Sequence, residues 1–111
     1  MLMKITEVNR LELLRTEVMA DLNKAVASLE EIAFKAESER GDKKNATRLR
    51  IKAGTVKEVL NQWGDRLVRV TRVEDAAGIL AVVKMDADNA DLEAEREGLL
   101  LAHHYIARLV R

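Results

Sequence analysis

The chain has 111 residues, with 19 Lys+Arg against 19 Asp+Glu, so its formal net charge is zero when histidine is neutral. Its 48% hydrophobic and 34% charged residues exclude a disordered tail and a membrane protein. Because it contains no cysteine, a disulfide scaffold, a cysteine-ligated metal site and a cysteine nucleophile are also excluded. The length predicts a single helical domain over residues 1–111.

The start of the chain lacks the apolar core and small-residue cleavage site of a signal peptide. No stretch approaches the ~18 consecutive apolar residues that a membrane span needs. We therefore expect a cytoplasmic protein that has no membrane partner.

Apolar residues recur at helical spacing through residues 6–40. They follow one another in steps of three and four: Leu11, Leu14, Val18, Leu22, Ala25, Leu29, Ile32 and Ala36. This spacing places them on one face of a helix, which would span about 52 Å at 1.5 Å per residue. Gly41 then predicts the end of this helix, because glycine suits the left-handed position that follows a helix.

A second helix is predicted over residues 45–72, with Asn45 as its N-cap. It holds the strictest repeat in the chain: Ala46, Leu49, Ala53, Val56, Leu60, Trp63, Leu67 and Val70. Alternating steps of three and four over more than three heptads are typical of a coiled coil. Gly64, followed by Asp65, is where we expect any break in this helix. Trp63 and Phe34 are expected to pack in the core.

Residues 66–85 allow two interpretations. The β-branched stretch 67–73 and the apolar run 79–83 could form a β-hairpin. The heptad that continues through Leu67 and Val70 favours a helix, and an isolated hairpin is marginal in water. We therefore predict a helix over residues 75–86.

A last helix is predicted over residues 90–110. It is apolar over more than half its circumference, which is typical of a helix at the centre of a bundle or at an oligomer interface. The predicted fold class is all-α, as an antiparallel long-helix bundle or a coiled-coil-like helical hairpin with a C-terminal helix. The alternative is an α fold with a small β-hairpin at 66–85.

Charge is segregated along the chain despite the net balance. Residues 1–42 hold 6 basic and 9 acidic side chains. Residues 43–73 hold 9 basic and 2 acidic side chains, and residues 74–111 hold 4 basic and 8 acidic ones. The basic middle could bind nucleic acid or another anionic partner, since phosphate contacts supply most non-specific affinity. On a helical wheel its charges surround the heptad face instead of forming one stripe, which favours pairing with the acidic helices. The candidates for an anionic partner are Lys44, Arg48, Lys52, Arg66 and Arg69.

Catalytic and metal-binding patterns are weak. His103 and His104 are adjacent, whereas metal-binding pairs on one helix lie three or four residues apart. The acidic run 86–97 departs from a calcium loop, because Ala90 and Asp91 occupy positions that need a ligand and a glycine. No phosphate-binding loop or nucleophile elbow is present. We predict no enzyme, no catalytic residue, no metal and no cofactor.

The sequence thus predicts a non-enzymatic protein-interaction module. It would be homo-oligomeric, as a dimer, and would bind another protein as an adaptor, chaperone or inhibitor. The predicted interface between copies comprises Leu49, Val56, Leu60, Trp63, Leu67, Leu99, His103 and Ile106. The alternative is a small nucleic-acid-binding regulator that uses the basic segment 43–72.

Overall fold

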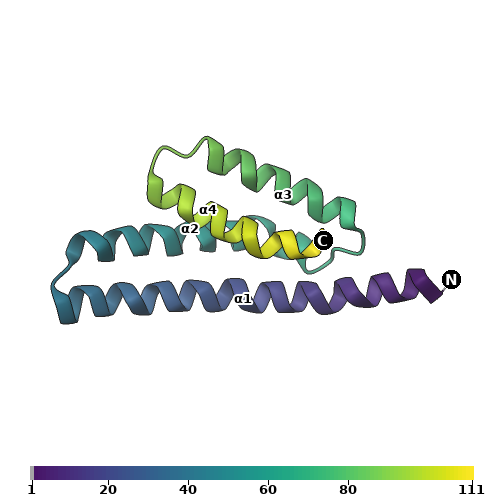
Figure 1. Ribbon diagram of the computed structural model, residues 1–111, viewed down its shortest axis with the longest axis horizontal. Coiled ribbons are helices and arrows are strands. Elements are labelled where there is room, and N and C mark those ends of the chain that lie inside the picture. Colours follow the sequence, from purple (N-terminus) through teal and green to yellow (C-terminus); the bar gives the residue numbers. More distant parts are fainter. Residues whose placement is uncertain (1) are drawn as a thin grey trace.

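A computed structural model describes residues 2–111, with side chains described from residue 9 onward. It comprises four α-helices and a short 3₁₀ helix: α1 (Leu2–Arg40), α2 (Lys43–Leu67), α3 (Val73–Asp88), α4 (Glu93–Ile106) and η1 (Ala107–Leu109) (Figure 1). The predicted all-α class is confirmed, and the described residues form no strand. The β-hairpin alternative for residues 66–85 is wrong, because this stretch contains the end of α2, a turn and most of α3.

The first helix ends where the sequence predicts. Gly41 has a φ of +64°, in the left-handed region that glycine adopts without strain. Its N–H donates to the carbonyl of Glu37 at 3.1 Å, and the N–H of Asp42 donates to the carbonyl of Ala36 at 2.9 Å. The Asp42 side chain accepts from the N–H of Asn45, so Asp42 is the N-cap of α2 and the prediction of Asn45 is wrong.

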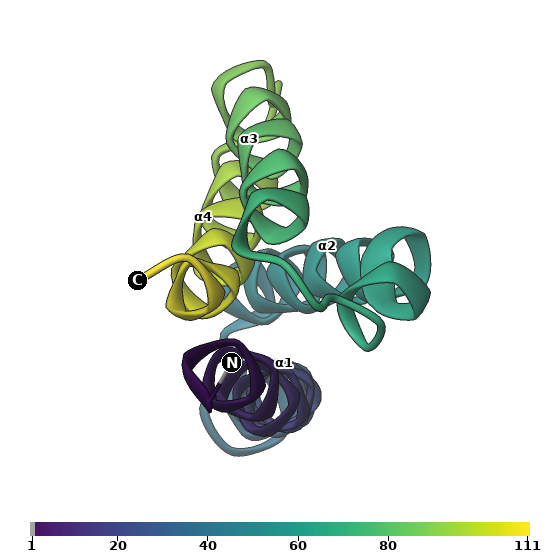
Figure 2. The same cartoon turned by 90° about the vertical axis from the view of Figure 1, so that its right-hand side faces the viewer.

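The helices are arranged in three layers. From the turn after α1, α2 runs back along α1 (Figure 1), and α4 lies beside α2 (Figure 2). The third layer is α3, which lies on α4 and makes few contacts with α2. The molecule measures 58 × 27 × 20 Å and its radius of gyration is 15.7 Å. A compact chain of this length would have a radius of about 13 Å, so the fold is elongated.

The main core runs through the three layers, and all four helices contribute to it. Its largest fully buried side chains are Val18, Leu22, Val56, Leu67, Val83, Ile106 and Leu109. A separate small cluster of Ala33, Ala36 and Ala46 lies near the turn between α1 and α2. No helix in the described part of the chain is both long and apolar enough to cross a bilayer.

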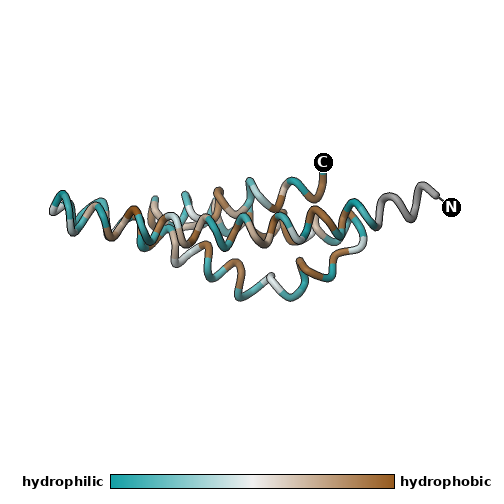
Figure 3. Tube along the Cα trace, turned by 90° about the horizontal axis from the view of Figure 1, so that it is seen from below, coloured by the Kyte–Doolittle hydropathy of each residue, from teal (hydrophilic) through white to brown (hydrophobic). Residues whose placement is uncertain are grey.

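The buried face of α1 drifts away from the predicted positions. Figure 3 shows apolar positions recurring between polar ones along this helix. Val26 and Ala33 are buried, whereas Ile32 is half-exposed, because a 3.6-residue helix does not keep a fixed repeat on one line. Phe34 is 66% exposed, so the expectation that it packs in the core is wrong. Trp63 is half-buried and packs against the main core, as expected.

The second helix ends at Leu67 and shows no break at Gly64. Gly64 is buried, and a Cβ built on it would make an ordinary van der Waals contact of 3.5 Å with Cε of Met19. The N–H of Val70 then donates to the carbonyl of Leu67 at 3.4 Å. Arg15 of α1 donates to the Val70 carbonyl at 2.6 Å, which ties the turn between α2 and α3 to the first helix.

Candidate functional site

Ion pairs join the basic helix α2 to α1. Arg50 lies 2.5 Å from Glu37, and Lys57 lies 3.2 Å from Glu30. Both acidic residues belong to the net-negative first segment of the sequence. These contacts support the interpretation that the basic segment pairs within the chain.

Of the five candidate residues for binding an anionic partner, two also make ion pairs within the chain. Arg48 donates a hydrogen bond to Glu97 of α4, and the Lys52 ammonium lies 3.7 Å from the same carboxylate. Glu97 is 21% exposed, so one half-buried carboxylate is the ion-pair partner of both cations. A nucleic acid would have to displace Glu97 to use Arg48 and Lys52 together.

We expect Glu97→Gln to lower the free energy of unfolding by about 1 kcal/mol, because both cations lose their carboxylate. Chemical denaturation at one protein concentration measures the loss. The matched control is Glu31→Gln, which breaks the exposed pair with Lys35 and should change stability by less than about 0.5 kcal/mol. Equal losses of unfolding free energy in the two variants would show that the Glu97 contacts stabilise the fold no more than an exposed surface ion pair does.

The other three candidate cations make no ion pair within the described residues. The Arg66 guanidinium lies 5.3 Å from the centre of the Trp63 ring, a cation–π contact. Lys44 and Arg66 are 22 residues apart on α2, which corresponds to about 33 Å along a helix. Lys44, Arg66 and Arg69 therefore do not form one continuous basic patch.

Outside α2, Arg108 pairs with Glu17 at 3.1 Å and Asp21 at 2.6 Å of α1, and neither histidine takes part in these ion pairs. His103 is half-buried and His104 is exposed, with its ring packed edge-on against Tyr105. Within the described residues, no three His, Asp or Glu side chains converge as they would around a metal ion. The hydrogen bond that Lys84 donates at 2.7 Å lowers the pKa of the Asp88 carboxyl. That pair is one helical turn apart and exposed, so the shift has a local structural cause.

Three of the eight residues of the predicted interface between copies are internal to one chain. Val56, Leu67 and Ile106 are 0% exposed in the main core, so a second copy cannot contact their side chains. At these positions the heptad face of α2 packs against helices of its own chain. The remaining five residues are half-buried: Leu49, Leu60, Trp63, Leu99 and His103.

The helix α3 exposes an apolar surface that the sequence analysis missed. Residues 76–83 contain no polar side chain, and this stretch covers two turns of the helix. Ala76, Ile79, Val83 and Ala87 are the buried residues of α3. The outer face of α3, as we call it, consists of exposed residues on the opposite side: Ala77, Gly78, Ala81 and Met85. The signal that could have revealed it is the run of eight residues without a polar side chain.

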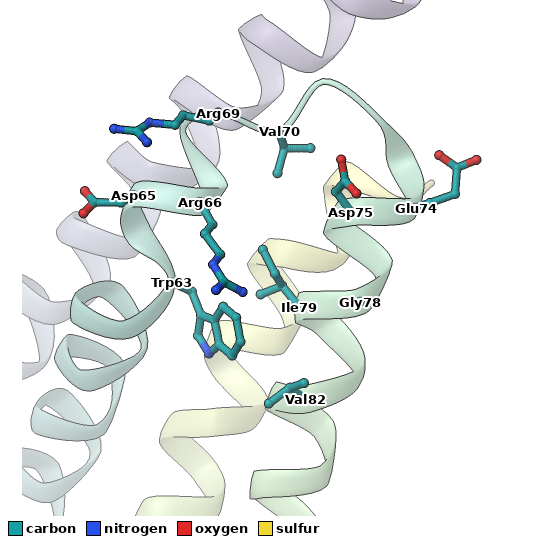
Figure 4. Close-up of a pocket in the computed structure, with 10 residues that line it drawn as sticks. All are labelled: Trp63, Asp65, Arg66, Arg69, Val70, Glu74, Asp75, Gly78, Ile79 and Val82. Carbon is teal, nitrogen blue, oxygen red and sulfur yellow. The ribbon is translucent and has the colours of Figure 1, made fainter.

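A groove lies next to this outer face, between α2 and α3. Trp63 and Val70 line it from the α2 side and Ile79 and Val82 from α3, around a cavity of about 520 Å³. Figure 4 shows Trp63, Ile79 and Val82 pointing into this space. We call this the α2–α3 groove.

Charged residues form the rims of the α2–α3 groove. Arg66 and Arg69 lie on the α2 side, and Glu74 and Asp75 lie at the start of α3. In Figure 4 Arg66 reaches toward the Trp63 ring, whereas Arg69 and Glu74 point away from the cavity. Asp65 also lines the α2 side, so the groove combines an apolar floor with a rim of mixed charge on the α2 side and an acidic rim at the start of α3.

A second hollow, of about 550 Å³, lies further along α2, beside the turn between α3 and α4. Gly54 and Glu58 line it from α2, and Asp86, Asp91 and Glu95 line it from the other side. This hollow is more acidic than the first. Together the two hollows follow α2 over most of the length of α3.

Comparison with known proteins gives no relative: no family model, no curated protein and no solved structure matches this chain.

Proposed function

We propose that this protein is a non-enzymatic helical protein-interaction module of the cytoplasm. It is homo-oligomeric and acts as an adaptor, chaperone or inhibitor by binding another protein. Its binding surface is the outer face of α3 together with the α2–α3 groove.

The single observation that supports this proposal is an apolar stretch of α3, residues 76–83, that is exposed on the side away from the buried residues. A helical stretch that is hydrophobic on all sides is normally surrounded by other protein. In α3 the buried residues lie on one side, and Met85 on the opposite side is 61% exposed. Contiguous exposed apolar surface of this kind marks sites of protein–protein contact.

The ion pairs of α2 favour a protein partner over a nucleic acid. Arg48, Arg50, Lys52 and Lys57 each contact a carboxylate of α1 or α4. These cations are therefore already neutralised by the fold, and phosphate contacts would have to compete with them. The nucleic-acid alternative becomes one outcome of the test.

Affinity capture from a native lysate tests the proposal, with wild type, Ala81→Glu and Ala27→Glu as baits. Ala81 lies on the outer face of α3, and Ala27 is an exposed alanine of α1, so the same charge is added at two exposed helix positions. We expect a protein that wild type and Ala27→Glu both capture, that survives nuclease, and that Ala81→Glu fails to capture.

Two results would contradict the proposal. Recovery that disappears after nuclease treatment would identify nucleic acid as the ligand, and the basic segment would become the site. Equal capture by Ala81→Glu and Ala27→Glu would remove the outer face of α3 from binding. Circular dichroism of each bait verifies that the variants keep the helical fold.

A further inference from the structure

We propose that the α2–α3 groove and the second hollow together bind one amphipathic helix of a partner protein, with a cationic end of that helix in the second hollow. This inference rests on the proposed function, because it names the chemistry of the partner that the same side of the molecule binds. A helix laid into a groove is a recurring mode of protein recognition, in which one apolar side of the bound helix makes the contacts.

The two hollows lie end to end along one face of α3. The residues of α3 that line them recur every three or four positions, so they share one side of the helix. They are Asp75, Gly78, Ile79 and Val82 at the α2–α3 groove, and Asp86, followed by Asn89 and Ala90, at the second hollow. From Asp75 to Asp86 this face extends about 16 Å, which matches three turns of a bound helix.

Space for a bound helix exists because α2 and α3 both pack on α4 and make few contacts with each other. In Figure 2 α3 lies above α4 and α2 lies beside it, and no helix in the described part of the chain occupies the angle between α2 and α3. Gly54 lines the second hollow and Gly78 lines the groove, and a Cβ built on either meets no atom within 4 Å. A partner helix can therefore approach the backbone of α2 and of α3 closely.

The α2–α3 groove offers apolar contacts with little preference for charge. Trp63, Ile79 and Val82 point into its space (Figure 4). The charged residues that line it nearly balance, since they are Asp65, Glu74 and Asp75 against Arg66 and Arg69. This part of the surface therefore selects the apolar side of the bound helix.

The second hollow has an unbalanced negative charge. No cation lines it, and its four carboxylates make no ion pair within the described residues: Glu58, Asp86, Asp91 and Glu95. The lysines nearest in sequence are engaged elsewhere, because Lys84 pairs with Asp88 and Lys52 with Glu97. A lysine or arginine of a bound helix would supply the missing positive charge, and such complementarity determines which partners bind.

The same charges argue against the helices of this chain as the occupant. The start of α3 carries Glu74 and Asp75 and its end carries Asp86 and Asp88, so either end of a second α3 would add carboxylates to an acidic hollow. The cations of α2 already contact carboxylates of α1 and α4. The complementary helix therefore belongs to a different protein.

Fluorescence of Trp63, the only tryptophan of the chain, tests binding at the groove itself. The probe is a synthetic amphipathic peptide of about 16 residues without tryptophan, with leucines on one side and lysines toward one end. Two versions carry the lysines at opposite ends, because either direction of the bound helix can place its cationic end in the second hollow. A third peptide has glutamate in place of every lysine. We expect one of the lysine peptides to bind at least about tenfold more tightly than the glutamate peptide, and to lose affinity as salt is added.

Charge reversal locates the cationic end. Glu58→Lys combined with Asp86→Lys reverses two exposed carboxylates of the second hollow without breaking an ion pair, and should weaken binding of the lysine peptide about tenfold. The matched control combines Glu12→Lys with Glu39→Lys, which changes the net charge equally at exposed positions of α1 outside both hollows. It should weaken binding less than about twofold. Glu58→Gln with Asp86→Asn provides a milder variant, and circular dichroism verifies the fold of each.

Three results would overturn this inference: equal affinity for the lysine and glutamate peptides, equal weakening in the two charge-reversed proteins, or no change of Trp63 fluorescence with any peptide. A dimeric wild type that Glu58→Lys with Asp86→Lys converts to a monomer would likewise overturn it, and would identify a second copy as the occupant.

The proposed function fails separately. Selective binding of the lysine peptide, without any lysate protein whose capture depends on Ala81, keeps the helix site and removes the adaptor, chaperone or inhibitor role. Capture that depends on Ala81, with equal affinity for the lysine and glutamate peptides, keeps the interaction module and removes the cationic helix.

Discussion

Replacing Leu22 with alanine is expected to lower the free energy of unfolding by about 2–5 kcal/mol. Leu22 is fully buried in the main core, to which α1 contributes by packing against α2 and α4. The truncated side chain loses its transfer free energy and leaves a cavity that a rigid helix cannot close. Equilibrium denaturation by urea, followed by circular dichroism, measures the loss. Both proteins are compared at the same concentration, because the apparent stability of a protein that self-associates depends on concentration.

The matched control is Leu13→Ala, on the same helix. Leu13 is 69% exposed, so its truncation should change stability by less than about 0.5 kcal/mol. Similar losses in Leu13→Ala and Leu22→Ala would mean that the buried side of α1 has been assigned wrongly.

Gly98→Ala is expected to destabilise the fold by about 1–3 kcal/mol, although alanine is the better helix former. A Cβ on Gly98 would lie 2.8 Å from both the backbone oxygen of Lys52 and Cβ of Thr55. Neither atom can move without shifting α2, so α4 would be pushed away from α2. The melting temperature should therefore fall by several degrees.

Gly54→Ala provides a control of opposite sign. A Cβ on Gly54 meets open space, so alanine should raise stability by about 0.5–1 kcal/mol through helix propensity alone. Both glycine variants are compared with wild type at one protein concentration. A melting temperature that rises in Gly98→Ala would show that α2 and α4 are less closely packed than described.

The elements with strong local signals could be predicted from the sequence. An uninterrupted helical period predicts α1. Gly41 predicts its end, because the residue that follows the helix adopts a positive φ, which glycine tolerates. The segregation of charge predicted the pairing of α2 with its neighbours, such as Arg50 with Glu37. These features depend on residues close in sequence, or on helices that follow each other along the chain.

The interface residues could not be predicted in this way. A heptad of apolar residues requires a neighbouring helix, but the pattern is the same whether that helix belongs to the same chain or to a second copy. Val56 and Leu67 are therefore apolar because α2 packs within its own chain. The exposed side of α3 was missed because the position of α3 on α4 decides which of its apolar residues remain uncovered.

The small alanine cluster near the turn between α1 and α2 has a consequence for dynamics. Ala33, Ala36 and Ala46 bury little apolar area, and their cluster is separate from the main core. Local opening costs least where few apolar contacts are lost. We therefore expect the end of the hairpin over residues 33–49 to open before the main core, and hydrogen exchange to show earlier exchange of its amides than of those around Leu22. Local stability would then decrease along the long axis toward this turn.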